Sequence, residues 1–277
     1  MFEAGAAFWD QEPGVVAVPN ISFDFSGERV LVTGASRGIG YGIAAAFAKA
    51  GAELTILAES DDIFGAAKRL SEATGRAVRG INCDIANERA VSRELADLGR
   101  IDILVNNAGL ELITPLLDTS EAVMAAFHRI VAINVLGTYF VSRVAVPKMQ
   151  AGGRIIFTAS IWSRVSVAEF GAYCASKHAN LGYMRALAKE LGPKGIRVNA
   201  VCPGWVRTEA SMRSLQEISR RTGRSEPDLL AEIVGNQVFD GLMEPDDVAP
   251  FYLYLASDAA ANMTGQALMA DRGEVMA

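Results

Sequence analysis

The 277-residue chain is poor in the residues that build disulfide scaffolds and metal sites, with three cysteines and two histidines. Cys83, Cys174 and Cys202 are widely spaced and odd in number, and no paired histidine pattern accompanies them. Such a set forms neither a disulfide framework nor a zinc site, and it is typical of a reducing compartment. The sequence therefore predicts no bound metal and a cytoplasmic location.

Runs of basic residues are also absent, and 26 Lys and Arg against 32 Asp and Glu give a formal net charge of −6. A nucleic-acid-binding surface needs clustered positive charge, so we expect no nucleic-acid partner. No stretch approaches the ~20 apolar residues of a spanning helix, so we expect no membrane partner. Residues 1–26 lack the basic start and apolar centre of a signal peptide, and we interpret them as an N-terminal extension outside the core fold.

Short aliphatic runs alternate with longer helical patterns from residue 29 onward, as in βαβ units. The alternation predicts a single α/β domain over residues 27–277, a doubly wound Rossmann fold with a seven-stranded parallel sheet and helices on both faces. Strands are expected at 29–33, 53–57, 77–81, 101–105, 154–158, 196–201 and 266–269. Helices are expected at 39–50, 63–73, 88–97, 121–149, 172–191 and 246–256.

A polar, arginine-rich segment at 208–242 interrupts this alternation between the sixth strand and the last helix. Insertions after the carboxyl ends of strands cover the ligand crevice in open α/β sheets. We interpret the segment as a substrate lid. The alternative is an ordinary helical hairpin on the surface.

The first expected strand runs into a glycine turn that opens a helix, Thr33-Gly34-Ala35-Ser36-Arg37-Gly38-Ile39-Gly40. Glycine permits a tight turn and a close approach of the backbone to a pyrophosphate, whose charge is attracted by the N–H groups and dipole of the helix start. Because a second strand follows this helix, the pattern predicts a dinucleotide-binding site.

Tyr173 and Lys177 are four residues apart in an expected helix, so their side chains share one face. A free phenol has a pKa of about 10, and a nearby ammonium favours the phenolate and lowers that pKa. The pair is a candidate for proton transfer. Taken alone, a chance surface pair would explain the same spacing.

These motifs, in this order, resemble those of the short-chain dehydrogenase/reductase family over residues 29–273. The spacing from Tyr173 to Lys177 differs from the longer spacing of the enoyl-reductase branch, and the chain is shorter than the extended branch of sugar-nucleotide enzymes. The resemblance rests on the glycine turn, Cys83-Asp84-Ile85, Asn106-Asn107-Ala108-Gly109, Asn134, Ser160, the Tyr173/Lys177 pair and Pro203-Gly204.

The resemblance implies an NAD(P)-dependent oxidoreductase that interconverts a secondary alcohol and a ketone. Tyr173 would exchange the proton and Ser160 would hold the substrate oxygen. Lys177 would lower the tyrosine pKa and bind the nicotinamide ribose, while Asn134 would anchor a water that leads to solvent. The residues implied to bind the cofactor are Gly34, Ser36, Arg37, Gly38, Ile39, Gly40, Glu59, Asp84, Ile85, Asn107, Ala108, Gly109, Tyr173, Lys177, Pro203, Gly204, Val206 and Thr208.

The residues after the second expected strand give mixed indications of the preferred cofactor. Ala58 stands where NAD-preferring members of the family carry an aspartate, yet Glu59, Asp61 and Asp62 follow it. Carboxylates there bind the adenine ribose and repel the 2′-phosphate of NADP, whereas Arg37 would attract that phosphate. The balance favours NAD, with NADP as the alternative.

Substrate contacts are expected from Glu111, Trp162 and Trp205, which follow motif strands or lie beside the catalytic elements, and pocket walls also from Arg164, Glu169 and Arg207. A polar, aromatic-lined pocket suits a small polyol, sugar or hydroxy acid better than a long acyl chain. Two alternatives stay open. One is a 3-oxoacyl thioester reductase, and the other is a non-catalytic dinucleotide sensor, which would be expected to have lost the catalytic residues.

The helices expected at 121–149 and 172–191 carry more apolar residues than one sheet face needs, and surplus apolar helix faces mark interfaces. On the first helix these are Ile133, Val135, Leu136, Val141, Val144 and Val146. The resemblance implies a homotetramer that pairs these helices across a two-fold axis and pairs again near the C-terminal strand. Arg272 replaces a family glycine there, which puts the local turn in doubt and makes a dimer the fallback.

Overall fold

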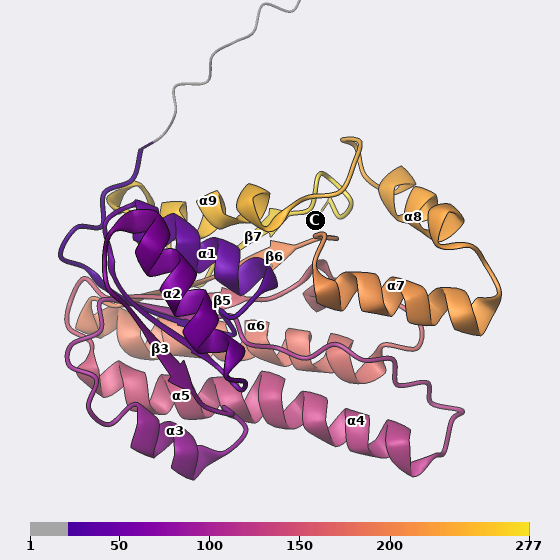
Figure 1. The fold of residues 1–277 in the computed structure, drawn as a ribbon, viewed down its shortest axis with the longest axis horizontal. Coiled ribbons are helices and arrows are strands. Elements are labelled where there is room, and N and C mark those ends of the chain that lie inside the picture. Colours follow the sequence, from indigo (N-terminus) through magenta and orange to yellow (C-terminus); the bar gives the residue numbers. More distant parts are fainter. Residues whose placement is uncertain (1–21, 277) are drawn as a thin grey trace, which may run out of the picture.

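A seven-stranded parallel sheet forms the centre of the computed structural model, which describes residues 22–276. The strand order is β3-β2-β1-β4-β5-β6-β7, so the connections cross over the sheet as in a Rossmann fold, and the predicted fold is confirmed (Figure 1). The order reverses between β1 and β4, where open α/β sheets bind ligands. The strands are β1 Arg29–Thr33, β2 Glu53–Ala58, β3 Val78–Asn82, β4 Ile103–Asn106, β5 Arg154–Thr158, β6 Arg197–Pro203 and β7 Ala267–Ala270.

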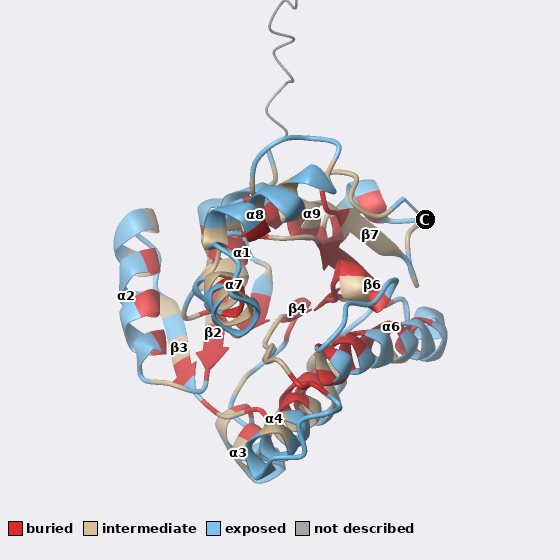
Figure 2. Cartoon of the chain, turned by 90° about the vertical axis from the view of Figure 1, so that its right-hand side faces the viewer, coloured by how far each residue is buried: buried red, intermediate tan, exposed pale blue. Residues whose placement is uncertain are grey.

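Helices cover both faces of this sheet. They are α1 Gly38–Lys49, α2 Asp62–Thr74, α3 Glu88–Glu94, α4 Glu121–Val131, α5 Thr138–Ala145, α6 Gly171–Leu191, α7 Glu209–Thr222, α8 Glu226–Gly235 and α9 Pro245–Ala256. One face packs on α1, α2 and α9, with Phe47 and Tyr252 fully buried. The other packs on α3, α5 and α6, with Val91 and Met184 fully buried. Figure 2 shows buried residues along the strands and the inner sides of these helices.

The helix expected at 121–149 is not a single α-helix. α4 ends at Val131, a π-helical segment (η1) occupies Ala132–Gly137, and α5 continues from Thr138. Gly137 in this segment packs against Ile85, whose Cγ1 would be 2.6 Å from a Cβ at that position. π-helical turns inside α-helices are frequent at functional sites. This one carries Asn134.

By length and composition, Glu121–Lys148 passes as a membrane-spanning helix, with a mean hydropathy of 1.5 in one window. This finding corrects the expectation that no stretch comes near that limit. The apolar residues Ile133, Val141 and Ala145 are buried against the sheet. The stretch is therefore a core helix.

Residues 1–21 of the expected N-terminal extension lie outside the described residues. Its described end belongs to the core, because Phe25 is buried and meets Phe47 edge-on, with ring centroids 5.0 Å apart. The Phe25 N–H also donates to the Ala50 carbonyl at 2.7 Å. The packed fold thus begins before the boundary predicted at residue 27.

The segment at 208–242 folds as a pair of helices, α7 and α8, on the right of Figure 1. α7 begins with a capping box, in which the Thr208 hydroxyl accepts the Ser211 N–H at 3.1 Å. It ends at Gly223, which has a φ of +70°. This helix directs its first turn toward the carboxyl ends of the strands.

Arg272, where the family resemblance predicts a glycine, adopts a glycine-like turn conformation. Its φ is +56°, in the left-handed region, which costs roughly 1–2 kcal/mol for a residue other than glycine. The Arg272 carbonyl accepts the Val238 N–H at 2.9 Å, and the guanidinium donates to the Asp240 carbonyl. These contacts offset the cost and bind the C-terminal segment to the chain after α8.

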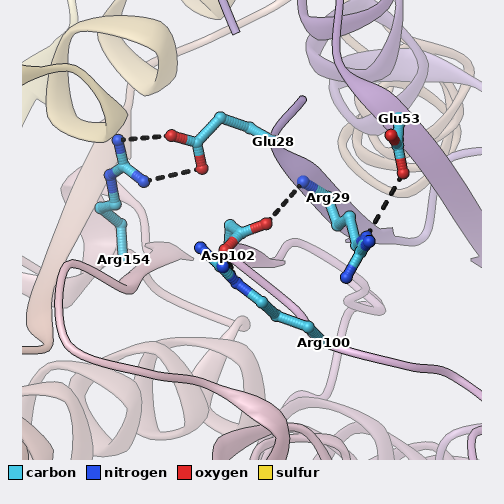
Figure 3. Close-up of polar contacts among 6 residues, drawn as sticks. All are labelled: Glu28, Arg29, Glu53, Arg100, Asp102 and Arg154. Carbon is cyan, nitrogen blue, oxygen red and sulfur yellow. Dashed lines mark hydrogen bonds and ion pairs between the residues drawn. The ribbon is translucent and has the colours of Figure 1, made fainter. Parts of the chain in front are cut away.

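A polar network fixes the amino ends of the central strands (Figure 3). Arg154 on β5 donates to Glu28 at 2.9 and 3.3 Å and to the Ala256 carbonyl at 2.7 Å, with 13% of its side chain exposed. Asp102, buried before β4, accepts the Arg29 N–H at 2.9 Å and an Arg100 N–H at 2.5 Å. The two carboxylates thus hold β1, β4 and β5 together at the end opposite the ligand edge.

We expect Arg154→Ala to lower the free energy of unfolding by ~2–3 kcal/mol, because it leaves Glu28 and the Ala256 carbonyl partly buried without their partner. The matched control is Arg29→Ala, whose pair with Glu53 is 50% and 62% exposed and therefore worth ~0–1 kcal/mol. Urea unfolding followed by circular dichroism measures both losses. Equal losses in the two variants would contradict the argument.

Candidate active site

A cavity of about 390 Å³ lies at the carboxyl ends of the central strands, beside the starts of α1 and α7. Every residue predicted to bind the cofactor lines it, from Gly34 to Thr208, as do Ser160 and the three predicted substrate contacts. Asn134 lies behind the wall. Among residues 22–276, no group of three or more His, Cys, Asp or Glu side chains is arranged to hold a metal ion.

The glycine turn leaves room for backbone only. Gly34 has a φ of +67°, and a Cβ there would lie 2.7 Å from the Ala108 Cα. A Cβ on Gly40 would lie 2.1 Å from the Gly34 carbonyl oxygen. Because the turn and the start of α1 line the cavity, their N–H groups and the helix dipole suit a pyrophosphate. The geometry therefore fits a dinucleotide.

Asn107 ties this turn to the neighbouring strands. Its Nδ2 donates to the carbonyls of Thr33 and Gly34 at 2.9 and 3.2 Å, and its Oδ1 accepts the Thr158 hydroxyl at 3.1 Å. The Thr33 hydroxyl accepts the N–H groups of Asn107 and Ala108, both at 3.0 Å. The carboxyl ends of β1, β4 and β5 are thus joined by side chains.

The first turns of α6 bring Tyr173 and Lys177 to the cavity. Lys177 is 3% exposed, and its Nζ donates to the Thr158 carbonyl at 2.7 Å. The same Nζ lies 5.5 Å from the centre of the Tyr173 ring. Burial lowers the pKa of Lys177 to about 8. The two side chains of the predicted pair therefore lie close together at the cavity.

The pKa of Tyr173 departs from the expectation in the opposite direction. Burial raises it first, the Glu111 carboxylate raises it further, and the Ser160 hydroxyl lowers it in part. Lys177 is not among the groups that shift this pKa, and its Nζ donates to the Thr158 carbonyl, so the lowering by Lys177 stays a prediction. The phenol is therefore protonated at neutral pH, as a proton donor must be, but a pKa nearer neutrality would make the transfer easier.

Ser160 begins a short 3-10 turn after β5. Its hydroxyl accepts the Trp162 N–H at 3.1 Å, and its own N–H donates to the Ser163 hydroxyl at 3.1 Å. Trp162 stands edge-on to Tyr173, with centroids 5.8 Å apart, and edge-on to Trp205 at 6.4 Å. The phenol thus lies between a fixed serine and an aromatic wall.

Asn134 is fully buried and uses its amide within the protein. Its Oδ1 accepts the Leu110 N–H at 2.7 Å, and its Nδ2 donates to the Leu110 carbonyl at 3.0 Å and the Ser176 hydroxyl at 2.9 Å. These bonds fix the chain after β4 against α6. The role of water anchor stays a prediction.

Glu111 contributes an oxygen that nothing in the described chain satisfies. Its Oε1 is buried without a hydrogen-bond partner, although the residue lines the cavity. Burial raises the pKa of this carboxyl, against the lowering effects of Ser214, Arg213 and Lys177. Arg213 and Ser214 come from α7, and no sequence pattern indicated which residues of this helix face the cavity.

Three residues expected in the pocket wall do not line the cavity. Glu169 pairs with Arg221 at 3.1 Å, Arg207 pairs with Glu244 at 2.9 Å, and Arg164 is exposed. The prediction was wrong for these residues, because two of the long charged side chains bind partners at the surface and the third faces solvent.

Known proteins share these features. A family model described as enoyl-(acyl carrier protein) reductase matches residues 34–274. Oxidoreductase UcpA of Salmonella typhimurium is 36% identical over 260 residues, 91% of this chain and 95% of that protein. D-threitol dehydrogenase of Mycolicibacterium smegmatis is 34% identical over 263 residues, 92% and 96% of the two chains. The crystal structure of L-sorbose reductase from Gluconobacter frateurii, complexed with NADPH and L-sorbose, has a TM-score of 0.82 at 28% identity and covers 93% and 100%.

The fold and the site define an NAD(P)-dependent oxidoreductase that acts on CH–OH groups. The chain belongs to the short-chain dehydrogenase/reductase family. The nicotinamide cofactor carries the hydride in this chemistry, and the glycine turn, Asn107 and the cavity walls are the groups that would hold it.

We expect Tyr173→Phe to lower kcat by about 10²–10⁴-fold, the usual contribution of a positioned acid or base. Cofactor affinity should change little, because only the hydroxyl is lost. Turnover on the best substrate and NADH binding by tryptophan fluorescence measure the two effects. Lys177→Ala should damage both. A Tyr173→Phe variant that keeps a large share of the rate would refute the assignment of the acid.

Proposed function

We propose that this protein interconverts a secondary alcohol and a ketone on a small polyhydroxylated molecule, a polyol or a sugar, with NAD(H) preferred. One observation carries the proposal. The Tyr173 phenol and the Ser160 hydroxyl face a cavity that Glu111 also lines, and the Oε1 of this carboxyl is buried without a hydrogen-bond partner. A substrate with a second hydroxyl group would donate to the Glu111 carboxyl while its carbonyl lies beside the phenol.

Each residue has a separate task in this reaction. Ser160 donates to the substrate oxygen and holds it next to Tyr173, which gives its proton when a ketone is reduced and takes one when an alcohol is oxidised. Lys177 holds a buried positive charge near the phenol and stabilises the phenolate that forms. Asn134 holds the chain after β4 against α6. The water that it is predicted to bind would pass the proton between the site and solvent.

The walls favour this substrate over a 3-oxoacyl thioester. Glu111 and Arg213 put ionisable side chains in the cavity, and packing an acyl chain against such polar groups is unfavourable. Trp162 and Trp205 supply flat apolar surfaces of the kind that pack on sugar carbons. Among the relatives, the names D-threitol dehydrogenase and L-sorbose reductase denote polyol and sugar enzymes. A non-catalytic sensor is disfavoured because all four predicted catalytic residues are present.

The helical pair α7 and α8 is proposed as the substrate lid. Arg213 lines the cavity, and Ser214 approaches the Glu111 carboxyl closely enough to lower its pKa. Movement of α7 would therefore change the polarity around Glu111 together with access to the cavity. This coupling supports a lid more than a passive surface hairpin.

NAD(H) is preferred in this proposal because carboxylates dominate the adenosine end of the cavity. Glu59 and Asp62 line it, as does Asp84. Arg37, the expected partner of a 2′-phosphate, already lies 4.0 Å from Asp62 and 3.5 Å from Glu209. Its charge is thus largely compensated, and a dianionic phosphate would meet net negative charge.

A cytoplasmic location also remains our proposal. Cys83, Cys174 and Cys202 are all free and buried. Burial raises the pKa of Cys83 to about 11, so this thiol is unreactive near neutrality. Free thiols are what a reducing compartment maintains.

Substrate selection is tested with polyols, sugars, hydroxy acids, a simple secondary alcohol and a 3-oxoacyl thioester, each assayed by NADH absorbance. We expect turnover of polyols or sugars, and a ~10-fold or larger loss of their kcat/KM in Glu111→Gln, because a hydrogen bond to a charged acceptor becomes a neutral one. Activity on the simple alcohol, which lacks a second hydroxyl group, should change by a smaller factor. Glu72→Gln is the matched control, since its carboxylate is 65% exposed on α2.

Two outcomes would contradict this proposal in different ways. If wild type turned over none of the compounds but bound NADH, the protein would be a sensor. If polyols were good substrates but Glu111→Gln left their kcat/KM unchanged, the oxidoreductase would stand without the substrate contact at Glu111.

The proposed assembly is a homotetramer, with a dimer as fallback. Ile133 and Val141, counted above as surplus, are buried within the subunit. Leu136, from the same list, is exposed, as are Met124, Phe127 and Tyr139 on α4 and α5. They support an interface on this side of the molecule.

We expect light scattering at low micromolar concentration to give the mass of a tetramer. Phe127→Glu, at a side chain 41% exposed on α4, should reduce that mass by placing charge in the interface. Phe64→Glu is the control, because this phenylalanine is 52% exposed on α2, away from the proposed contact. A wild-type monomer would refute the interface.

A further inference from the structure

Arg129 joins two of the carboxylates that line the adenosine end of the cavity. From α4 it donates to Glu59 Oε2 at 2.7 Å through one terminal nitrogen and to Asp84 Oδ2 at 2.9 Å through the other. Glu59 follows β2 and Asp84 follows β3, so three distant parts of the chain meet here. No sequence motif pointed to this arginine.

The guanidinium of Arg129 lies within reach of anything that binds Glu59. One terminal nitrogen of Arg129 donates a hydrogen bond to the Glu59 carboxylate, and Glu59 lines the cavity. Arginine presents a planar fork of donors that fits a phosphate as well as a carboxylate. Arg129 is 39% exposed at its side chain, so a ligand group can approach it.

Occupation by carboxylates keeps this arginine from binding other anions. Two negative groups surround one positive group, which leaves a net charge of −1 around the position where a 2′-phosphate would bind. Neutralising Glu59 would free one side of the guanidinium and cancel that net charge. Asp84 would still hold the other side and keep the arginine in place.

We propose that Glu59 masks Arg129, and that Arg129 is a latent 2′-phosphate-binding residue which the loss of the Glu59 charge exposes. The inference deepens the NAD(H) preference proposed above and rests on it. Glu59 then disfavours the 2′-phosphate in two ways. Its charge repels the phosphate, and it occupies the Arg129 N–H group that would bind it. Cofactor preference is thus set by a pair of residues from different elements.

The test measures binding of two fragments rather than turnover. Calorimetry at low ionic strength gives dissociation constants of adenosine 5′-monophosphate and adenosine 2′,5′-bisphosphate for wild type, Glu59→Gln, Arg129→Gln and the double variant. We expect wild type to favour the monophosphate or bind both equally. Glu59→Gln should shift the ratio by ~10-fold or more toward the bisphosphate, and the double variant should lose most of that shift.

Arg37→Gln in the Glu59→Gln background is the matched control. It removes a positive charge from the same end of the cavity but leaves Arg129 in place, so it should keep most of the shift. Equal losses with either arginine removed would indicate general electrostatics and overturn the proposal. So would a shift that depends on Arg37 alone. Thermal melting of each variant checks that these exposed substitutions leave the fold intact.

The wild-type ratio separates this inference from the cofactor preference on which it rests. A wild type that binds the bisphosphate tenfold more tightly would refute the NAD(H) preference. If Arg129→Gln then abolished that tighter binding, Arg129 would already be available, and masking by Glu59 would be refuted as well.

Discussion

The hydrogen bond from the buried Lys177 ammonium to the Thr158 carbonyl fixes the catalytic helix to the sheet, and the site depends on it. Thr158 ends β5, and its hydroxyl contacts Asn107 at 3.1 Å and the Tyr252 hydroxyl at 2.8 Å. Asn107 extends the chain of bonds to the glycine turn through the Thr33 carbonyl. The groups proposed for proton transfer and for dinucleotide binding therefore belong to one hydrogen-bond network.

Burial acts on both members of the tyrosine and lysine pair, in opposite directions on the pKa. It lowers the pKa of Lys177 to about 8 and raises that of Tyr173, because the uncharged forms need less solvation. An argument from spacing alone considers only the attraction between phenolate and ammonium. In the folded protein, desolvation and the nearby Glu111 outweigh that attraction. The result is a protonated phenol beside a lysine whose ammonium form is made less stable by burial.

The strands and most helices could be predicted because apolar runs bounded by turn residues determine them locally. The π-helical segment could not, since Ala132–Gly137 reads as ordinary α-helix. What widens the turn is packing from elsewhere, including Gly137 against Ile85 and the bonds from Asn134 to Leu110. Similarly, Phe25 belongs to the core only because Phe47 lies beside it. Tertiary contacts decide such features, and a local pattern does not contain them.

The motif residues of the site could be predicted because their chemistry requires particular residue types at fixed spacings. Their electrostatic partners could not, since Arg129 is 70 residues from Glu59 and 45 from Asp84. A cofactor prediction from the number of acidic residues after β2 assumes that each carboxylate is unpaired. In the structure, Glu59 binds Arg129 and Asp62 lies near Arg37. A carboxylate that already binds a guanidinium repels an anion less, but it also withholds the donor that the anion would need. Charge selection at this site therefore follows from which side chains pair across the fold, and the number of acids in one loop is a poor measure of it.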